Sequence, residues 1–154
     1  MATSRKQHAI GELVGEFRNS CNLDGAFDSV AAARLRLNAT DLRCINIVEN
    51  AGGISAGALA VESGLTTGAV TGVIDRLERA GFARRVSDPG DRRRVRVEVT
   101  AAFYANADEI WGPVRADWES TLSQRFTTEQ LEQALAFLRT VNAISGRHLE
   151  RLRG

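Results

Sequence analysis

The sequence predicts a mostly α-helical chain with one small β-hairpin, and three observations lead to this fold class. Apolar residues recur at helical spacing through most of the 154 residues. From Val95 to Val99 the pattern changes to alternation of valine with charged residues, which is typical of a half-buried strand. A Pro89-Gly90 turn signal precedes this strand, as expected in a hairpin.

The stretch 64–100 organises the chain. A helix is expected to begin at Thr66, whose side chain can accept a hydrogen bond from a backbone N–H, and to end at Gly81. Its apolar face carries Val70, Val73, Ile74 and Leu77. Its opposite face carries Gly68, Thr71, Gly72, Asp75, Arg76 and Arg79. Two glycines inside a helix cost about 1 kcal/mol each relative to alanine. They are tolerable where something large comes close to the backbone, and a DNA major groove is such a surface.

A hairpin should follow this helix. Residues 82–86 are expected to pair with residues 95–99, and Arg92, Arg93 and Arg94 lie just past the turn. A helix with such a β-wing is a winged helix-turn-helix. The helix would sit in the major groove, and the wing would place an arginine in the adjacent minor groove.

The motifs in this stretch also point to a family. The segment TTGAVTGVIDRLERAGF followed by DPGDRRRVRVEVT resembles the DNA-binding core of the MarR family of bacterial transcriptional regulators. The match covers about residues 37–100, and the Asp-x-Arg signature of the wing falls on Asp91-Arg92-Arg93. This sequence departs from the family pattern at Phe103, where glycine is usual, and at Arg94, where a small residue is common. The resemblance implies N- and C-terminal helices that interlock into a homodimer, and a ligand pocket where these helices meet the winged domain.

We therefore expect a single MarR-type chain over 1–154, with a winged helix-turn-helix core at 38–100. It would be flanked by N- and C-terminal dimerisation helices at 4–37 and 101–154. The apolar stripes of the terminal helices have little of the winged core to pack on, which also favours burial against a second copy.

The boundaries of the other helices follow from local signals. A first helix is expected over 4–21, a turn over 22–27 and a short helix over 29–37. Thr40 is expected to cap a helix over 41–50, and Ser55 to cap the first helix of the helix-turn-helix. Thr100 should cap a long helix that Gly112-Pro113 interrupts with a kink, and the last helix should start at 127–129.

The charge pattern favours a specific nucleic-acid binder. The chain has a net charge of only +1, but residues 64–100 hold eight arginines and five acidic residues, which makes this segment net +3. A locally basic segment in a neutral chain suits a specific binder better than a general polyanion binder. The alternative is a solvated charged hairpin without a function.

Site residues can be named within this segment. Thr67, Thr71 and Arg76 are expected to contact the major groove, while Asp75 is expected to orient an arginine of the wing. Arg93 is the expected minor-groove residue, with Arg92 and Arg94 as phosphate contacts. The helix N-termini capped by Ser55 and Thr66 can offer backbone N–H groups to phosphates.

A small-molecule site follows from the resemblance alone. Phe17, Arg43, Trp111 and Trp118 are the expected walls, with ordinary core packing as the alternative for the aromatic residues. Cys21 and Cys44 raise a redox-sensing alternative, because one MarR branch senses organic peroxides with a cysteine on the first helix. A buried thiol without a basic neighbour is instead an inert hydrophobe.

Other functional classes find little support in the sequence. No phosphate loop, nucleophile motif or metal-ligand spacing occurs, so neither an enzyme nor a cofactor is expected. The N-terminus does not read as a signal peptide, and no apolar run approaches the ~20 residues that cross a membrane, so we expect a cytoplasmic protein.

The predicted function is that of a transcriptional regulator. The chain is expected to be a repressor that binds a palindromic double-stranded operator as a homodimer and is released by a small molecule. The alternatives are a cysteine-based redox regulator of the same fold and a winged-helix module that binds a protein.

Overall fold

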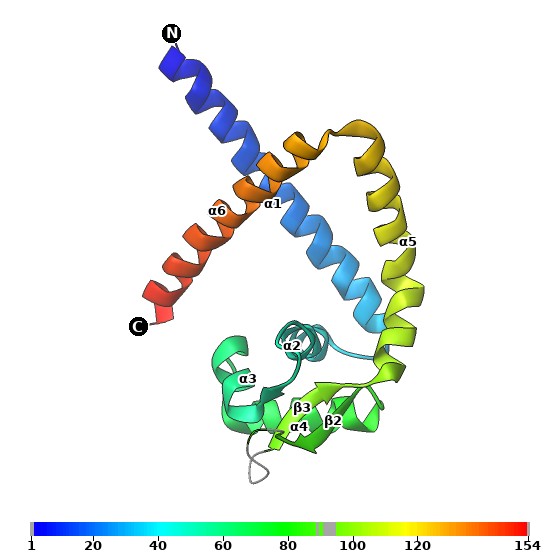
Figure 1. Cartoon of the computed structure of the whole chain (residues 1–154). Coiled ribbons are helices and arrows are strands. Elements are labelled where there is room, and N and C mark those ends of the chain that lie inside the picture. The colour runs from blue at the N-terminus through cyan, green and yellow to red at the C-terminus, as the bar shows by residue number, and fades with distance from the viewer. Residues whose placement is uncertain (1, 89, 91–94, 154) are drawn as a thin grey trace. The chain divides into compact units, whose positions relative to one another are not determined.

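The computed structural model describes residues 2–88, 90 and 95–153 and confirms a mostly α-helical chain with a small antiparallel sheet (Figure 1). Its helices are α1 (Ala2–Arg34), α2 (Ala39–Asn50), α3 (Ala56–Ser63), α4 (Thr67–Arg79), α5 (Ala101–Arg125) and α6 (Thr128–Arg153). Its strands are β1 (Ile54–Ser55), β2 (Ala83–Ser87) and β3 (Val95–Val99). The chain divides into two compact units, with the boundary in the sequence between Ile110 and Trp111.

The sheet has the strand order β1-β3-β2, with both pairs antiparallel. The pairing of β2 with β3 runs from Ala83 opposite Val99 to Ser87 opposite Val95, so β2 lies one residue later than predicted. β1 is a strand of two residues, in which Ile54 pairs with Val97. Val97, in the central strand, is buried, whereas Val95 at the open end is exposed.

The core of the first unit forms where α2, α3 and α4 pack together with the sheet. The predicted apolar face of α4 is buried there, together with apolar side chains of α2 and α3. The buried residues are Leu42, Ile45 and Val48 of α2, Leu59 of α3, and Val70, Val73, Ile74 and Leu77 of α4. Phe103, which stands where the family pattern has a glycine, is also buried and lies edge-on against Phe82, with ring centroids 5.7 Å apart. The larger residue therefore fills the core where α5 begins.

The predicted turn over 22–27 is wrong, because α1 is one continuous helix. Asp24-Gly25 is a turn signal, but a glycine inside a helix costs only about 1 kcal/mol relative to alanine. Leu23, Phe27 and Val30 continue the helical spacing i, i+4, i+7 through the segment. The helical periodicity therefore runs through Asp24-Gly25. Near the end of α1, Ala31 and Ala32 are buried in the first unit.

The predicted interruption of α5 at Gly112-Pro113 is also wrong, because the helix runs through Pro113 without a break. Proline removes one main-chain hydrogen bond and crowds the preceding turn. In a helix of 25 residues the bonds on either side continue the ladder. A kink at this point stays a prediction.

Most of the predicted helix caps are confirmed. The N–H groups of Ala58 and Ala69 donate to the side chains of Ser55 and Thr66, each at 3.2 Å. Thr100 accepts from Phe103 N–H at 3.4 Å. At the start of α6, Thr127 and Gln130 bond each other's backbone N–H groups, which is a capping box.

The cap of α2 differs from the prediction. Asn38, not Thr40, accepts the hydrogen bond, from Asp41 N–H at 2.8 Å. Both side chains belong to residue types that cap helices, and the helix starts two residues earlier than expected, at Ala39.

This correction has a measurable consequence. Asn38→Ala is expected to lower the free energy of unfolding by about 1 kcal/mol, because it removes the cap of α2. Thr40→Ala is the matched control and should change stability by no more than about 0.5 kcal/mol. Urea unfolding of the two variants gives both values, and a larger loss for Thr40→Ala would restore that residue as the cap.

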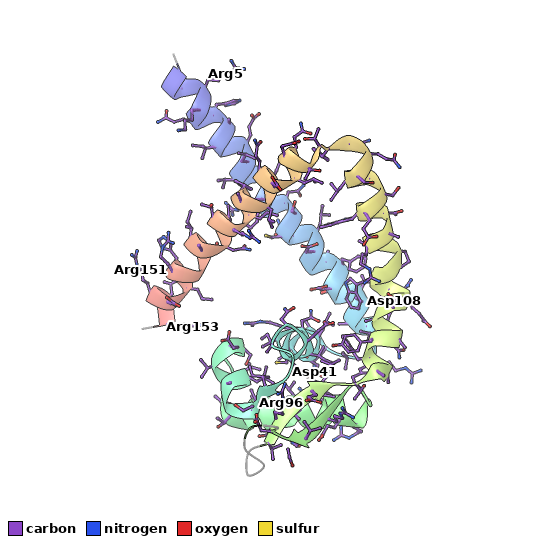
Figure 2. All side chains as sticks on the ribbon, viewed as in Figure 1. Arg5, Asp41, Arg96, Asp108, Arg151 and Arg153 are labelled. Carbon is purple, nitrogen blue, oxygen red and sulfur yellow. The ribbon has the colours of Figure 1, made fainter. Side chains whose placement is uncertain are left out.

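Two glycines form the turn after α2. Gly52 has φ +61° and Gly53 has φ +104°, a backbone region that residues with a Cβ rarely adopt. Arg96 of β3 lies against this turn and donates from Nη2 to the carbonyl of Gly52 (Figure 2). A Cβ at position 53 would lie 2.7 Å from Arg96 Cζ. Glycine at this position therefore brings the wing strand onto the end of α2.

Among the described residues, no single helix has the length and apolar composition to cross a membrane. Only α3 and α4 counted together satisfy this criterion, and they are bent by 109° at the break between them.

Candidate nucleic-acid interface

α3 and α4 form a helix-turn-helix. The two helices are joined through Gly64, Leu65 and Thr66 and differ in direction by 109°, within the range of this motif. The hydroxyl of buried Ser63 donates to the Leu59 carbonyl at 2.6 Å and accepts from Leu65 N–H at 3.4 Å. These bonds fix the turn and thereby the direction in which α4 leaves it.

The face of α4 opposite the core carries glycines and short polar side chains. Thr67, Gly68 and Thr71 are exposed and Gly72 is half-buried. A Cβ at Gly68 would meet nothing within 4 Å, so this part of the helix backbone is open to solvent. The Thr71 hydroxyl donates to the Thr67 carbonyl at 3.0 Å, which leaves its oxygen as an acceptor. A large partner can therefore approach this helix closely.

A hollow of about 490 Å³, here called the α2–α4 hollow, lies over the glycines of α4. Gly68 and Gly72 form part of its wall, and the first residues of α2 stand opposite. Its full lining is Asn38, Ala39, Thr40, Leu65, Gly68, Ala69, Gly72, Val73 and Arg76. Arg76 is the only charged residue in this lining.

Arg76 is held by a buried carboxylate from α2. Asp41 is 2% exposed and accepts from Arg76 Nε at 3.0 Å and from Nη2 at 2.6 Å (Figure 2). This hydrogen-bonded pairing raises the pKa of the Arg76 guanidinium above its usual value, so it stays charged. Nη1 has no partner among the residues that the structure describes, and it would lie 3.5 Å from a Cβ at Gly72. The predicted groove residue is thus fixed by a partner that sequence reasoning missed.

The sequence does contain a signal for this partner. Asp41, Ile45 and Val48 lie at i, i+4 and i+7, so the carboxylate shares a face with two core residues. A charge on the buried face of a helix indicates a buried ion pair, because an unpaired charge there is costly.

The wing is attached to α4 by a second set of ion pairs. Arg85 of β2 donates from Nη2 to Asp75 at 2.7 Å and also pairs with Glu78, whose carboxylate accepts from Arg85 N–H at 2.8 Å. Asp75 therefore orients an arginine of the wing, as predicted, and that arginine lies on strand β2. The hydrogen bond to Asp75 is the main cause that raises the pKa of Arg85.

These pairs account for most of the described arginines in the basic segment. Arg76, Arg84, Arg85 and Arg96 each pair with a carboxylate of the same unit. Arg79 has no such pair within the described part of the chain. Arg92, Arg93 and Arg94, the predicted wing-tip contacts, lie outside the described residues. Among the described arginines of this segment, Arg79 is thus the one without a carboxylate partner.

The predicted ligand residues are distributed over both units. Phe17 of α1 is half-buried and Arg43 of α2 is exposed, whereas Trp111 and Trp118 belong to the second unit. None of the four lines the α2–α4 hollow. Nothing in the first unit thus brings them together, and they stay a prediction.

The two cysteines differ in environment. Cys44 is fully buried, and burial is the main cause that raises its thiol pKa, which disfavours the reactive thiolate. Cys21 is exposed in the middle of α1. No group of His, Cys, Asp or Glu side chains among the described residues could hold a metal ion.

Comparison with known proteins agrees with this geometry. The family model described as "MarR family" matches residues 37–95, which span the helix-turn-helix and β2. The HTH-type transcriptional regulator YcgE of Bacillus subtilis is 39% identical over 129 residues, covering 82% of this chain and 82% of that protein.

Solved structures give the same result. A MarR-like transcriptional regulator from Thermotoga maritima superposes with a TM-score of 0.62 at 27% identity, covering 86% of this chain and 96% of that chain. Wild-type MarR from E. coli shares the fold with a TM-score of 0.55 at 22% identity, over 82% of this chain and 94% of that chain. The protein is thus a DNA-binding regulator rather than an enzyme, and the chain belongs to the MarR family of HTH-type transcriptional regulators.

Proposed function

We propose that this chain is a homodimeric repressor that binds a palindromic operator in double-stranded DNA and is released by a small-molecule effector. The observation that carries the DNA-binding part is the exposed face of α4. Two glycines and short hydroxyl side chains lie there, on a helix whose other face is anchored in the core. A helix of this kind fits a major groove and reads base edges with its N-terminal residues, here Thr67 and Thr71.

The remaining DNA contacts follow from the position of each group. Ser55 and Thr66 cap α3 and α4, whose N-termini attract phosphates. Arg93 would enter the minor groove beside the recognition helix, with Arg92 and Arg94 on phosphates. The described arginines on β2 and β3 pair with carboxylates, so we do not propose them as DNA contacts.

Exposed apolar side chains on the terminal helices support the proposal of a dimer. No described residue of α6 is buried, and large apolar side chains of both terminal helices are about half exposed. These are Ile10, Leu13 and Val14 of α1, and Leu135, Leu138, Ile144 and Leu149 of α6. A second copy with the same surface would remove them from water. Two copies related by a two-fold axis would present two recognition helices to a palindrome.

The effector site and the location are further parts of the proposal. Phe17, Arg43, Trp111 and Trp118 stay the proposed walls of a pocket for the effector, and the regulator would act on chromosomal DNA in the cytoplasm. A compound that occupies the site should lower operator affinity of the wild type and have a weaker effect on Trp118→Ala.

The test is selection of duplexes from a random pool by the full chain. We expect enriched inverted repeats whose half-sites lie about one helical turn apart, with affinity that falls steeply as salt increases. A protein-binding winged-helix module would enrich no sequence. For a redox regulator, peroxide would release the duplex, and alkylation of Cys21 would abolish that response.

Arg93→Ala is expected to weaken operator binding by about 1–3 kcal/mol and to relax the preference for an A·T-rich flank, because a narrow minor groove attracts a guanidinium. Repeating the selection with the variant measures both effects. Arg92→Ala and Arg94→Ala are the matched controls and should weaken binding evenly across sequences. If Arg93→Ala leaves affinity and flank preference unchanged, the minor-groove role belongs to one of these neighbours.

A further inference from the structure

We propose that Asp41 is a positioning residue for DNA binding. By holding the Arg76 guanidinium, it directs Nη1 of Arg76 into the α2–α4 hollow, where this group binds a backbone phosphate of the operator. The inference rests on the proposed function and adds to it a residue outside the helix-turn-helix and the wing.

Hydrogen bonds to Asp41 hold the guanidinium of Arg76 in one orientation. Asp41 is in the first turn of α2 and Arg76 is in the last turn of α4, 35 positions later. Nε and Nη2 both donate to the one carboxylate, so the plane of the guanidinium is fixed. An exposed arginine would lose rotamer freedom on binding a phosphate, whereas this one is already ordered. Binding to DNA therefore needs less reorganisation.

The position of Nη1, the guanidinium nitrogen of Arg76 that does not bind Asp41, indicates where an anion would bind. The side chain of Arg76 is 44% exposed, and its Nη1 lies beside Gly72, one turn earlier on the exposed face of α4. Gly72 and Arg76 both line the α2–α4 hollow, and Arg76 is the only charged residue among the described residues of this lining. An anion that reaches the described part of this hollow thus meets a single cation in a fixed orientation.

The place of Arg76 on the helix identifies the DNA group. Recognition helices contact base edges mainly with their N-terminal residues, and Arg76 lies in the last turn. The opposite wall of the hollow is the N-terminus of α2, whose backbone dipole also favours an anion. A phosphate at the edge of the groove fits both walls, whereas a base edge fits neither.

One substitution distinguishes positioning of Arg76 from general electrostatic attraction, because the two predict opposite changes in DNA affinity. Asp41→Asn removes a negative charge, so general attraction to DNA should become slightly stronger. Loss of positioning should instead weaken binding, by about tenfold or more, which is the range for a charge-assisted hydrogen bond. Glu49→Gln is the matched control: it removes one negative charge from an exposed site on the same helix and should leave affinity unchanged or slightly higher.

The experiment is a double-mutant cycle. Fluorescence anisotropy measures the binding of wild type, Asp41→Asn, Arg76→Ala and the double variant to the duplex that wild type selects from a random pool. Arg76→Ala should lower the slope of log affinity against log salt by about 1. In the Arg76→Ala background, Asp41→Asn should change affinity by less than about twofold, because the two act through one contact.

Each outcome decides the proposal. Affinity of Asp41→Asn equal to or above that of wild type overturns it. An equal loss in both backgrounds also overturns it, since that result means a general packing role for Asp41. Should Asp41→Asn not fold, Arg76→Lys carries the test. The ammonium of lysine lacks the planar fork of a guanidinium, so it cannot pair with Asp41 through two nitrogens and hold a third in a fixed position. A similar loss is therefore expected, and wild-type affinity overturns the proposal. If wild type enriches no duplex, the proposed function fails instead.

Discussion

Replacing Gly72 with leucine is expected to reduce operator affinity to the level of non-specific DNA, a loss of about a thousandfold or more, while the protein stays folded. Gly72 lies opposite the buried stripe of α4, so the new side chain meets DNA and not the core. A Cβ there has only Arg76 Nη1 nearby, at 3.5 Å, which is ordinary contact. The helix itself should become slightly more stable, by some tenths to about 1 kcal/mol.

Gly72→Ala provides the graded control for this result. A methyl group fits the available space and should leave most of the operator affinity, whereas leucine extends into the volume that DNA would occupy. Circular dichroism and urea unfolding report the fold, and anisotropy on the selected duplex reports binding. Normal affinity of the leucine variant would mean that this face of α4 does not enter a groove.

Deleting the residues after Phe126 is expected to give a monomeric or poorly soluble product whose operator affinity falls toward the non-specific level. α6 carries the uncovered apolar side chains of the second unit, and the same kind of stripe on α1 would lose its proposed partner. One recognition helix and one wing read only a few base pairs, so a monomer should lose most of its specificity.

A point substitution makes the same test without removing a helix. Leu138→Glu places a charge on a side chain that is 44% exposed in the single chain, so the monomer should tolerate it and a dimer should not. Gln133→Glu is the matched control, because Gln133 is exposed, lies on the same helix and gains the same charge. Sedimentation at micromolar concentration measures the state of each variant. A wild-type chain that is monomeric there and still binds its operator tightly would contradict the role given to the terminal helices.

Local patterns predicted the helix-turn-helix well. The stripe of α4 and the caps Ser55, Thr66 and Thr100 depend on residues within a turn or two of one another, and all are as expected. The same local reasoning failed at Asp24-Gly25, where a turn signal competed with apolar periodicity over a longer stretch. The periodicity prevailed there, since the cost of one glycine is small.

The partners of charged side chains could not be predicted in the same way. The Asp41–Arg76 pair joins helices that are remote in sequence, and the choice of Asp75 and Glu78 by Arg85 depends on the register of β2 against α4. Sequence indicated that Asp75 faces the wing, but packing decides which arginine each carboxylate pairs with. The apolar faces of the terminal helices were visible in the sequence, but the partner that we propose for them is a second copy, which one chain does not contain.

The turn at Gly52 and Gly53 bears on how this sequence can evolve. With φ at +104° and Arg96 lying against the space beside it, position 53 accepts no side chain while Arg96 keeps its contact with the Gly52 carbonyl. A lineage that loses this glycine must also release Arg96 and rebuild the loop before β1. Change at this corner therefore requires coupled substitutions rather than a single step.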